Sequence, residues 1–301
     1  MKKVLYTLLM LVVLMSLSSC KNSAEEKSVP DSEEDKNTQC EYSTDDESML
    51  ARGKDCYMHC KYDEAFKYFS QAAKLGNVEA KYYLALCYYY GNGEYKDEEK
   101  AVSMLDSLAT NGYLIAYSKL GGLYENGLNG IAENKNIAQT YYKKSFPAIK
   151  EYAEKGDVLS QYRLGFCYFY GCGVEKDEDK ATRWFRKAAE QDCAFAQTGL
   201  GNCYSEGVGV LPDKAEAVKW WRKAANQGDS QAQCLLGTSY LDGYGVEQDY
   251  NEAVKWLRKS AEQGYAPSLN LLGTCYKYGV GVSQDYQTAA IYYRKAQIKG
   301  M

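Results

Sequence analysis

The chain repeats a short pattern every 36 residues. Leu marks the same point in six successive copies; these positions are Leu84, Leu120, Leu164-Gly165, Leu200-Gly201, Leu236-Gly237 and Leu272-Gly273. In each copy a Tyr follows four residues after the Leu, and a Gly follows three residues after the Tyr. A fixed period of this length indicates stacked supersecondary units, which present long surfaces more often than they build pockets.

The first half of each copy has the spacing of one helix face. In the copy that starts at residue 194 the shared positions are Ala196, Leu200, Gly201, Tyr204 and Gly207. Residues three and four apart lie on one side of a helix, so this stripe is expected to pack against neighbouring helices. The Gly beside the Leu would allow a close approach of the next helix, and the final Gly is typical of a left-handed helix C-cap.

A short loop and a second helix complete each copy. The loop reads Gly-x-Gly-Val in several copies, and an Asp follows it at Asp177, Asp213, Asp249 and Asp285. Asp is a preferred N-cap, so these carboxylates are predicted to begin the second helix rather than act as acids or bases. That helix carries Ala-x-x-Trp-x-x-Lys-Ala, as from Ala217 to Trp220, which predicts large rings packed on small residues.

This pattern resembles the Sel-one-like repeat, a relative of the tetratricopeptide repeat. The run from Ala196 to Gly228 contains the motif in full. The resemblance implies an all-α fold, a right-handed superhelical solenoid of antiparallel helix pairs. It covers residues 78–301 in six units, which are 78–113, 114–157, 158–193, 194–229, 230–265 and 266–301.

Two places depart from the regular unit. Residues 49–77 have the shorter Gly-to-Ala spacing of a tetratricopeptide repeat, from Gly53 to Ala65, and are predicted to cap the array. The unit 114–157 contains eight extra residues in or after its second helix. Pro147 lies among them and is expected to break or kink that helix.

Positions that vary between units are free for recognition. Offsets of −2, +2, +5 and +6 from the Leu form a second stripe, which in the resembling family faces the concave groove. We predict that this stripe binds an extended peptide or protein segment, with aromatic anchors. The candidate residues are Tyr82, Leu86, Tyr89, Tyr90, Tyr162, Phe166, Phe169, Tyr170, Asn202, Thr238, Asn270 and Thr274. The alternative is that the rings thicken the packing between units.

The N-terminus has the pattern of a secreted lipoprotein. Lys2 and Lys3 precede a short apolar run that ends in Leu-Ser-Ser-Cys20, which resembles a bacterial lipobox. We expect residues 1–19 to be a signal peptide and Cys20 to carry a lipid anchor in the cell envelope, most simply at the outer membrane. Residues 20–48 are acidic and polar, and are predicted to form a flexible tether.

Cysteine and histidine provide only a weak case for a metal site. Cys87, Cys167, Cys203 and Cys275 share one offset and are interpreted as small buried residues, because equivalent helices lie too far apart for disulfides. Cys56, His59 and Cys60 have helical spacing, but no clear fourth ligand accompanies them. The sequence therefore predicts no metal and no cofactor.

Composition and motifs favour an interaction protein over an enzyme. The net charge of −4 gives no basic footprint for nucleic acid. A phosphate-binding role for Gly-x-Gly fails because the loop follows a helix. The single Ser-x-x-Lys spans the expected cleavage site at Ser18 to Lys21, and one His leaves no His-based triad. We therefore expect a membrane-anchored scaffold with a protein partner. The alternatives are an immunity or regulatory protein and, less favoured, an enzyme acting on cell wall or β-lactams.

Overall fold

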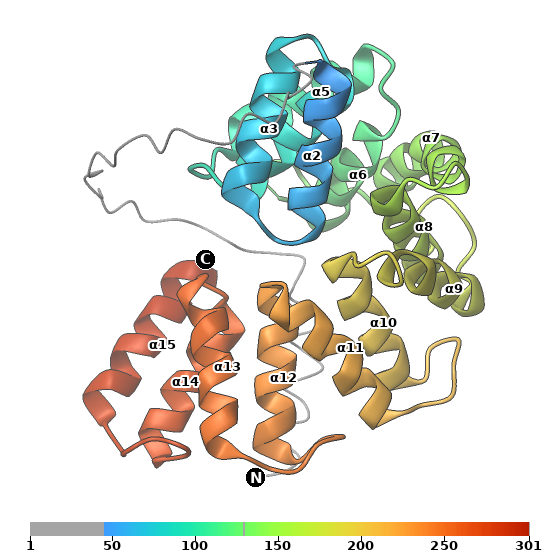
Figure 1. Ribbon diagram of the computed structural model, residues 1–301. Helices are drawn as coiled ribbons and strands as arrows, with labels where there is room; N and C mark the ends of the chain where they lie inside the picture. The colour runs from blue at the N-terminus through green and yellow to red at the C-terminus, as the bar shows by residue number, and fades with distance from the viewer. Residues whose placement is uncertain (1–44, 129, 301) are drawn as a thin grey trace, which may run out of the picture.

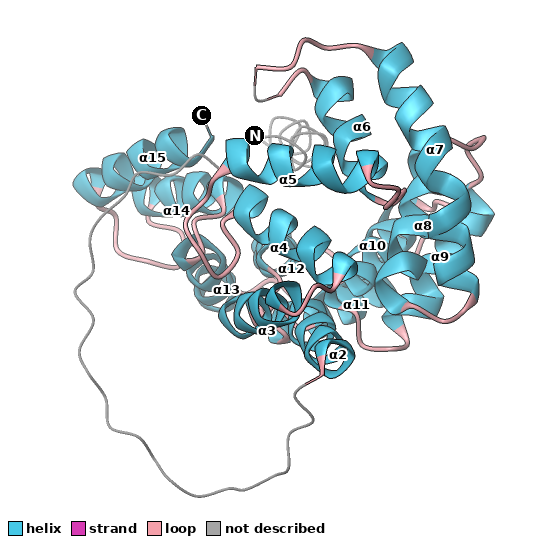
Figure 2. Cartoon of the chain, turned by 90° about the horizontal axis from the view of Figure 1, so that it is seen from above, coloured by secondary structure: helices cyan, strands magenta, loops and turns pink. Residues whose placement is uncertain are grey.

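The computed structural model describes residues 45–128 and 130–300, so Cys20, Cys40 and the predicted signal peptide lie outside it. This part of the chain folds into paired helices and contains no strand, as Figure 2 shows. The prediction of an all-α solenoid of antiparallel helix pairs is confirmed. The pairs are α2 (Asp46–Met58) with α3 (Tyr62–Lys74), α4 (Val78–Tyr90) with α5 (Glu98–Thr110), α6 (Ala116–Asn126) with α7 (Lys135–Glu154), α8 (Val158–Tyr170) with α9 (Glu178–Ala189), α10 (Ala194–Glu206) with α11 (Lys214–Asn226), α12 (Ser230–Asp242) with α13 (Tyr250–Glu262), and α14 (Ala266–Tyr278) with α15 (Tyr286–Gly300).

The helix ends follow the predicted capping chemistry. Gly207 ends α10 in the left-handed conformation, with φ of 75°, and the equivalent Gly does the same in the other five units. Asp213 begins α11, where its carboxylate accepts a hydrogen bond from the Glu216 amide at 2.9 Å. The Asp213 amide in turn donates to the Tyr204 carbonyl at 2.9 Å, so the intervening loop is tied at both ends.

Glycine allows two close approaches in each regular unit. A Cβ on Gly201 would lie 2.5 Å from the Trp221 ring, which confirms that the Gly beside the Leu accommodates the partner helix. The ring involved is not the predicted Trp220 but the residue after it. The second loop glycine, Gly245, would place a Cβ 2.2 Å from the Lys214 carbonyl oxygen, so each loop also rests on the preceding unit.

Two boundary predictions need correction. The predicted tether ends too late, because α2 already begins at Asp46, where Asp45 accepts from the Ser48 amide at 2.6 Å. Acidic residues in the first turn favour the positive end of the helix dipole, so they stabilise this helix rather than extend the tether. Of the two outcomes predicted at Pro147, the break is wrong, since α7 continues through it, and the kink stays a prediction. Buried side chains on both sides of the proline hold one face of α7 against its neighbours.

The solenoid curves until its first helix pair meets its middle. Figure 1 shows the chain following an arc, with α2 and α3 above the turn from α9 into α10. The Tyr57 ring of α2 lies 5.5 Å from the Phe195 ring of α10, and Cys60 packs beside Gly228 at the end of the same unit. The first pair therefore covers part of the surface that the superhelix would otherwise leave open.

Candidate interaction surface

The first offset of the predicted stripe is used for packing within the array. Tyr82 is only 2% exposed, and its ring lies 5.5 Å from that of Tyr113 in the turn before α6. Tyr162 is half-buried, with its ring 5.9 Å from both Phe185 and Phe195. Tyr162 therefore connects its own unit to the next, whereas Tyr82 packs against the end of its own unit, and both contacts agree with the alternative that these rings serve packing.

Four predicted groove residues are not available to a partner. Tyr82, Leu86, Tyr89 and Thr238 are all buried. Arg163 covers the Tyr82 ring at 5.2 Å, and Lys119 covers the Tyr89 ring at 3.5 Å. The prediction missed this because it assumed an open concave face. These side chains are instead covered by neighbouring units and by the curvature of the array.

The remaining predicted residues are partly or fully accessible. Phe166, Phe169, Asn202 and Thr274 are half-buried, and Asn270 is exposed. Asn202 accepts a hydrogen bond from the Trp221 indole at 3.0 Å, and the Thr274 and Tyr293 hydroxyls are 3.1 Å apart. Asn202 and Thr274 therefore also tie the two helices of their own pair together.

Only the last offset, +6, is exposed in all six units. We call these positions the inner row. It consists of Tyr90, Asn126, Tyr170, Glu206, Asp242 and Tyr278. Each is the last residue of the first helix of its pair and precedes the C-cap glycine. The structure thus narrows the predicted stripe to one line of side chains that every unit leaves accessible.

The N-terminal half of the inner row contains two tyrosines whose rings are held in place by neighbouring side chains. Tyr90 is 46% exposed, and its hydroxyl accepts a hydrogen bond from Lys119 at 2.9 Å. Tyr170 is 45% exposed, with its ring 4.4 Å from Phe166 and 4.7 Å from Phe169. Rings fixed by such neighbours lose little side-chain entropy on binding, which suits them as anchors.

The C-terminal half of the inner row contains two carboxylates. Glu206 and Asp242 make no ion pair within the described residues, although both are exposed. Burial of part of each carboxyl raises the pKa of Glu206 and of Asp242 above its ordinary value. Burial also raises the pKa of Tyr170, with a smaller contribution from the negative charge of Glu206, so these two side chains lie near each other.

A half-buried ion triad holds the arc in shape. The Lys54 ammonium on α2 pairs with Glu79 of α4 at 2.7 Å and with Asp157, which caps α8. The three side chains are 13% to 18% exposed. Nearby, Arg163 donates to the Tyr83 hydroxyl at 3.1 Å. Lys54 and Asp157 are 103 residues apart in the chain, so the triad joins helices that are distant in the sequence.

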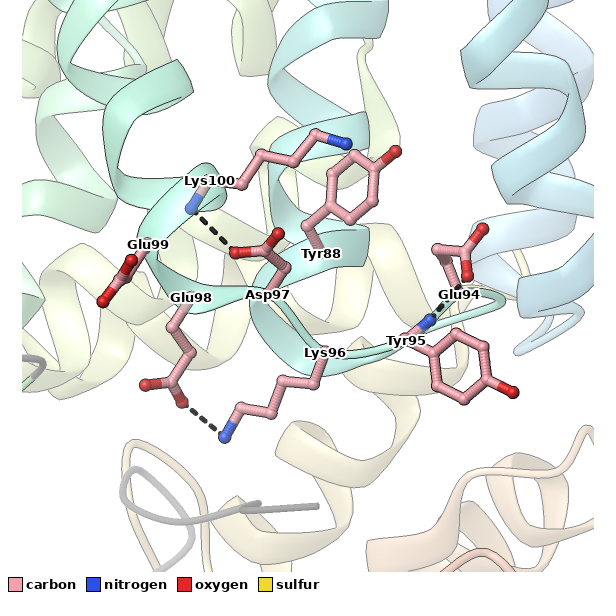
Figure 3. Close-up of a pocket in the computed structure, with 8 residues that line it drawn as sticks. All are labelled: Tyr88, Glu94, Tyr95, Lys96, Asp97, Glu98, Glu99 and Lys100. Atoms are coloured by element: carbon pink, nitrogen blue, oxygen red, sulfur yellow. Dashed lines mark hydrogen bonds and ion pairs between the residues drawn. The ribbon is translucent and has the colours of Figure 1, made fainter. Parts of the chain in front are cut away.

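A surface pocket lies at the loop between α4 and α5 (Figure 3). Its lining residues are Tyr88, Glu94, Tyr95, Lys96, Asp97, Glu98, Glu99 and Lys100. Most of their charges are satisfied locally, since Lys96 pairs with Glu98 and the Lys100 ammonium lies 3.7 Å from the centre of the Tyr88 ring. These contacts tie the loop to α5, and α5 to α4.

The cysteines and the single histidine do not form a metal centre in the part of the chain that the structure describes. His59 contacts the Asp55 carbonyl at 2.7 Å, while Cys56 is buried and Cys60 packs beside Gly228. The four cysteines at the shared offset are buried and unbridged, as predicted. Burial raises the pKa of the Cys203 and Cys275 thiols to about 11, which makes them inert at neutral pH.

The repeated geometry agrees with a known family. The Sel1 repeat profile matches seven segments, which are residues 61–77, 78–113, 114–146, 158–193, 194–229, 230–265 and 266–296. These segments make up most of the chain, so the protein belongs to the Sel1 repeat family. Sel1 repeat proteins act as scaffolds that bind other proteins. The first match begins inside the pair α2–α3, which corresponds to the segment 49–77 predicted to form a tetratricopeptide-like cap.

Curated relatives match over part of their length. The chain is 29% identical over 128 residues to human protein sel-1 homolog 2, covering 42% of this chain and 17% of that protein. It is 31% identical over 121 residues to an Arabidopsis thaliana component of an ERAD-associated E3 ubiquitin-protein ligase, HRD3B, covering 40% of this chain and 18% of that protein. The chain thus spans less than a fifth of either relative.

Solved structures of similar fold include bacterial proteins. A Sel1 repeat protein from Oxalobacter formigenes is 27% identical, with a TM-score of 0.53, and the match covers 82% of this chain and 96% of that one. The immunity protein Pa5087 from Pseudomonas aeruginosa is 21% identical, with a TM-score of 0.50, and the match covers 74% of this chain and 82% of that one. The second likeness concerns the fold alone.

Proposed function

We propose that the protein is a lipid-anchored scaffold of the bacterial cell envelope that binds an extended segment of a partner protein along its inner row. The observation that carries this proposal is the difference in solvent exposure between the four offsets of the predicted stripe. Three of the four predicted offsets are used wholly or partly for packing within the array, whereas the inner row is exposed in every unit. A rigid line of accessible side chains suits recognition of a segment that lies across several units.

The role proposed here is binding and not catalysis. The recurring Asp residues cap helices, and the one surface pocket described above anchors a loop. The inner row combines rigid tyrosines with carboxylates, a composition suited to a protein surface. An immunity role would use the same surface with a toxin as the partner.

Anchoring is proposed from the sequence around Cys20. No helix among the described residues is long and apolar enough to cross a bilayer. The lipobox-like run Leu17-Ser18-Ser19-Cys20 supports attachment through acyl chains on Cys20, and two or more chains give stable binding to a membrane. Residues 21–44 would then separate the solenoid from the membrane surface.

We predict that Cys20→Ser releases the protein from the membrane. Cells would be labelled with an alkyne fatty acid, fractionated, and the protein followed in each fraction. The wild-type chain should carry the label and sediment with membranes, because its acyl chains partition into the bilayer. Cys20→Ser should carry no label and remain in the supernatant. Cys40→Ser is the matched control, and it should behave like the wild type. Label on the Cys20→Ser chain would contradict the anchor.

A further inference from the structure

Two carboxylates of the inner row lack a counter-charge. Glu206 ends α10 and Asp242 ends α12, at equivalent positions of adjacent units. Two other carboxylates of the same units do have a partner, since Glu216 pairs with Lys219 at 2.8 Å and Glu252 with Lys255 at 3.0 Å. Within the described residues, Glu206 and Asp242 take part in no such pair. Their charges are therefore available to a cation from outside the chain.

The surroundings make this charge more effective than a freely solvated one. Part of each carboxyl is withdrawn from water, and this burial raises the pKa of both groups. A partly desolvated anion without a partner gains more from a nearby cation than a fully exposed one does, because water screens the attraction less. A positively charged side chain of a partner would supply the ion pair that these two carboxylates lack within the chain.

Aromatic rings lie on either side of the two carboxylates in the row. Tyr170 precedes Glu206 by one unit, and Tyr278 follows Asp242 by one unit. Both rings are exposed, Tyr278 by 63% and Tyr170 by 45%. A tyrosine face attracts Lys and Arg as well as apolar groups, so this order of residues suits a segment that mixes the two.

The step between units decides which residues of an extended chain could reach both carboxylates. We take this step as about 10 Å, the typical distance between packed helices. An extended peptide advances about 3.3 Å per residue, so its side chains three residues apart match one step. Two basic side chains at positions i and i+3 could therefore reach Glu206 and Asp242 together.

We propose that Glu206 and Asp242 receive two basic side chains, three residues apart, from an extended segment of the partner protein, beside an apolar or aromatic residue that packs on Tyr170. This inference rests on the proposed binding role of the inner row and specifies the chemistry of its partner. The step between units fixes the register of the segment, and the two carboxylates select its charge.

The test is selection of peptides on the purified full chain in detergent. The probe is a displayed library of random 12-residue peptides, from which the enriched sequences are synthesised and labelled. We expect enrichment of Lys or Arg at i and i+3 next to an aromatic or apolar residue. Binding of these peptides should be about tenfold weaker to Glu206→Gln/Asp242→Asn, and this difference should shrink at high salt.

The matched control is Glu190→Gln/Glu262→Gln, which removes two exposed carboxylates outside the inner row. It should bind the peptides as the wild type does, and both double variants should melt within about 2 °C of the wild type, since surface changes alter stability little. Enriched peptides without basic pairs, equal binding to both double variants, or no enrichment would overturn this inference. The proposed function would then still be judged by crosslinking from the inner row in cells, which requires no basic motif.

Discussion

Gly245→Ala is expected to lower the free energy of unfolding by about 3 kcal/mol. Gly245 has φ of 66°, a conformation that costs other residues about 1 kcal/mol or more. A Cβ there would also lie 2.2 Å from the Lys214 carbonyl oxygen and 2.5 Å from its carbon. This oxygen belongs to the backbone at the start of α11, so relief requires moving one unit relative to the next, at a further cost of 1–3 kcal/mol. Urea denaturation would measure the total.

Gly156→Ala is the matched control for this substitution. Gly156 also has a left-handed backbone, with φ of 100°, but a Cβ there would meet nothing within 4 Å. Gly156→Ala should lower the free energy of unfolding by about 1 kcal/mol, from backbone strain alone. Equal losses at the two glycines would show that the loop does not rest on the preceding unit. Hydrogen exchange should place the larger loss in the units that flank Gly245, because repeat arrays open locally.

Lys54→Met is expected to destabilise the contact between the first helix pair and α8 by about 2 kcal/mol. The substitution leaves Glu79 and Asp157 as two half-buried carboxylates without their shared ammonium. Removing one partner from a fully buried ion pair costs about 3–5 kcal/mol, and partial exposure of these groups reduces that figure. Met retains most of the side-chain volume, so the loss reports the charge. Hydrogen exchange of α2 and α3 amides would measure it.

The pH dependence of this loss follows from Asp157. Burial acts to raise its pKa, but the charge and hydrogen bond of Lys54 outweigh burial, so the pKa lies below the ordinary value of 3.8. A lowered carboxyl pKa stabilises the folded state above the ordinary value, and this stability is lost as the pH falls through the folded-state pKa. The difference between wild type and Lys54→Met should therefore be largest near neutral pH and shrink below pH 3.8.

Lys180→Met provides the comparison on the surface. Lys180 pairs with Asp177 at 2.8 Å, but its side chain is 54% exposed. Pairs of this kind contribute about 0.5 kcal/mol, so this variant should be close to the wild type. A similar loss for Lys54→Met and Lys180→Met would show that the triad does not hold the arc.

The regular units could be predicted from the sequence because local chemistry decides them. Glycines at Gly201 and Gly207 and the cap at Asp213 each have a nearby structural reason, and the same reason recurs every 36 residues. A second periodic signal was present but not used. Gln191, Gln227 and Gln263 each donate a side-chain hydrogen bond to the Gln thirty residues earlier, at 2.7 to 2.8 Å. These part-buried bonds each join the start and the end of one unit, and the period of Gln in the sequence marks them.

The errors arose where distant parts of the chain meet. The contacts from Lys54 to Asp157 and from Tyr57 to Phe195 depend on how far the array curves, and no single unit contains that information. They bring the first pair against the middle of the array, while Arg163 and neighbouring units bury Tyr82. Pro147 failed as a helix breaker for a related reason, since tertiary packing of α7 outweighs its local cost.

The candidate surface was only partly predictable. Variation between units marked positions outside the shared motif, but it could not separate exposed positions from those that neighbours cover. Tyr170 and Tyr162 look equivalent in the sequence, yet one is 45% exposed and the other packs between Phe185 and Phe195. Glu206 and Asp242 occupy the same offset as Tyr170 but are not among the predicted groove residues.

The most direct test of the interaction surface is photo-crosslinking in cells from Tyr170. A photoreactive phenylalanine would replace Tyr170 in one strain and Leu211 in another, since Leu211 is 88% exposed on a loop outside the inner row. Crosslinked products would be identified by mass spectrometry. The proposed role predicts one specific protein partner crosslinked at position 170 and absent at position 211. The same products from both positions, or no specific product from position 170, would contradict the claim that the inner row binds a protein partner.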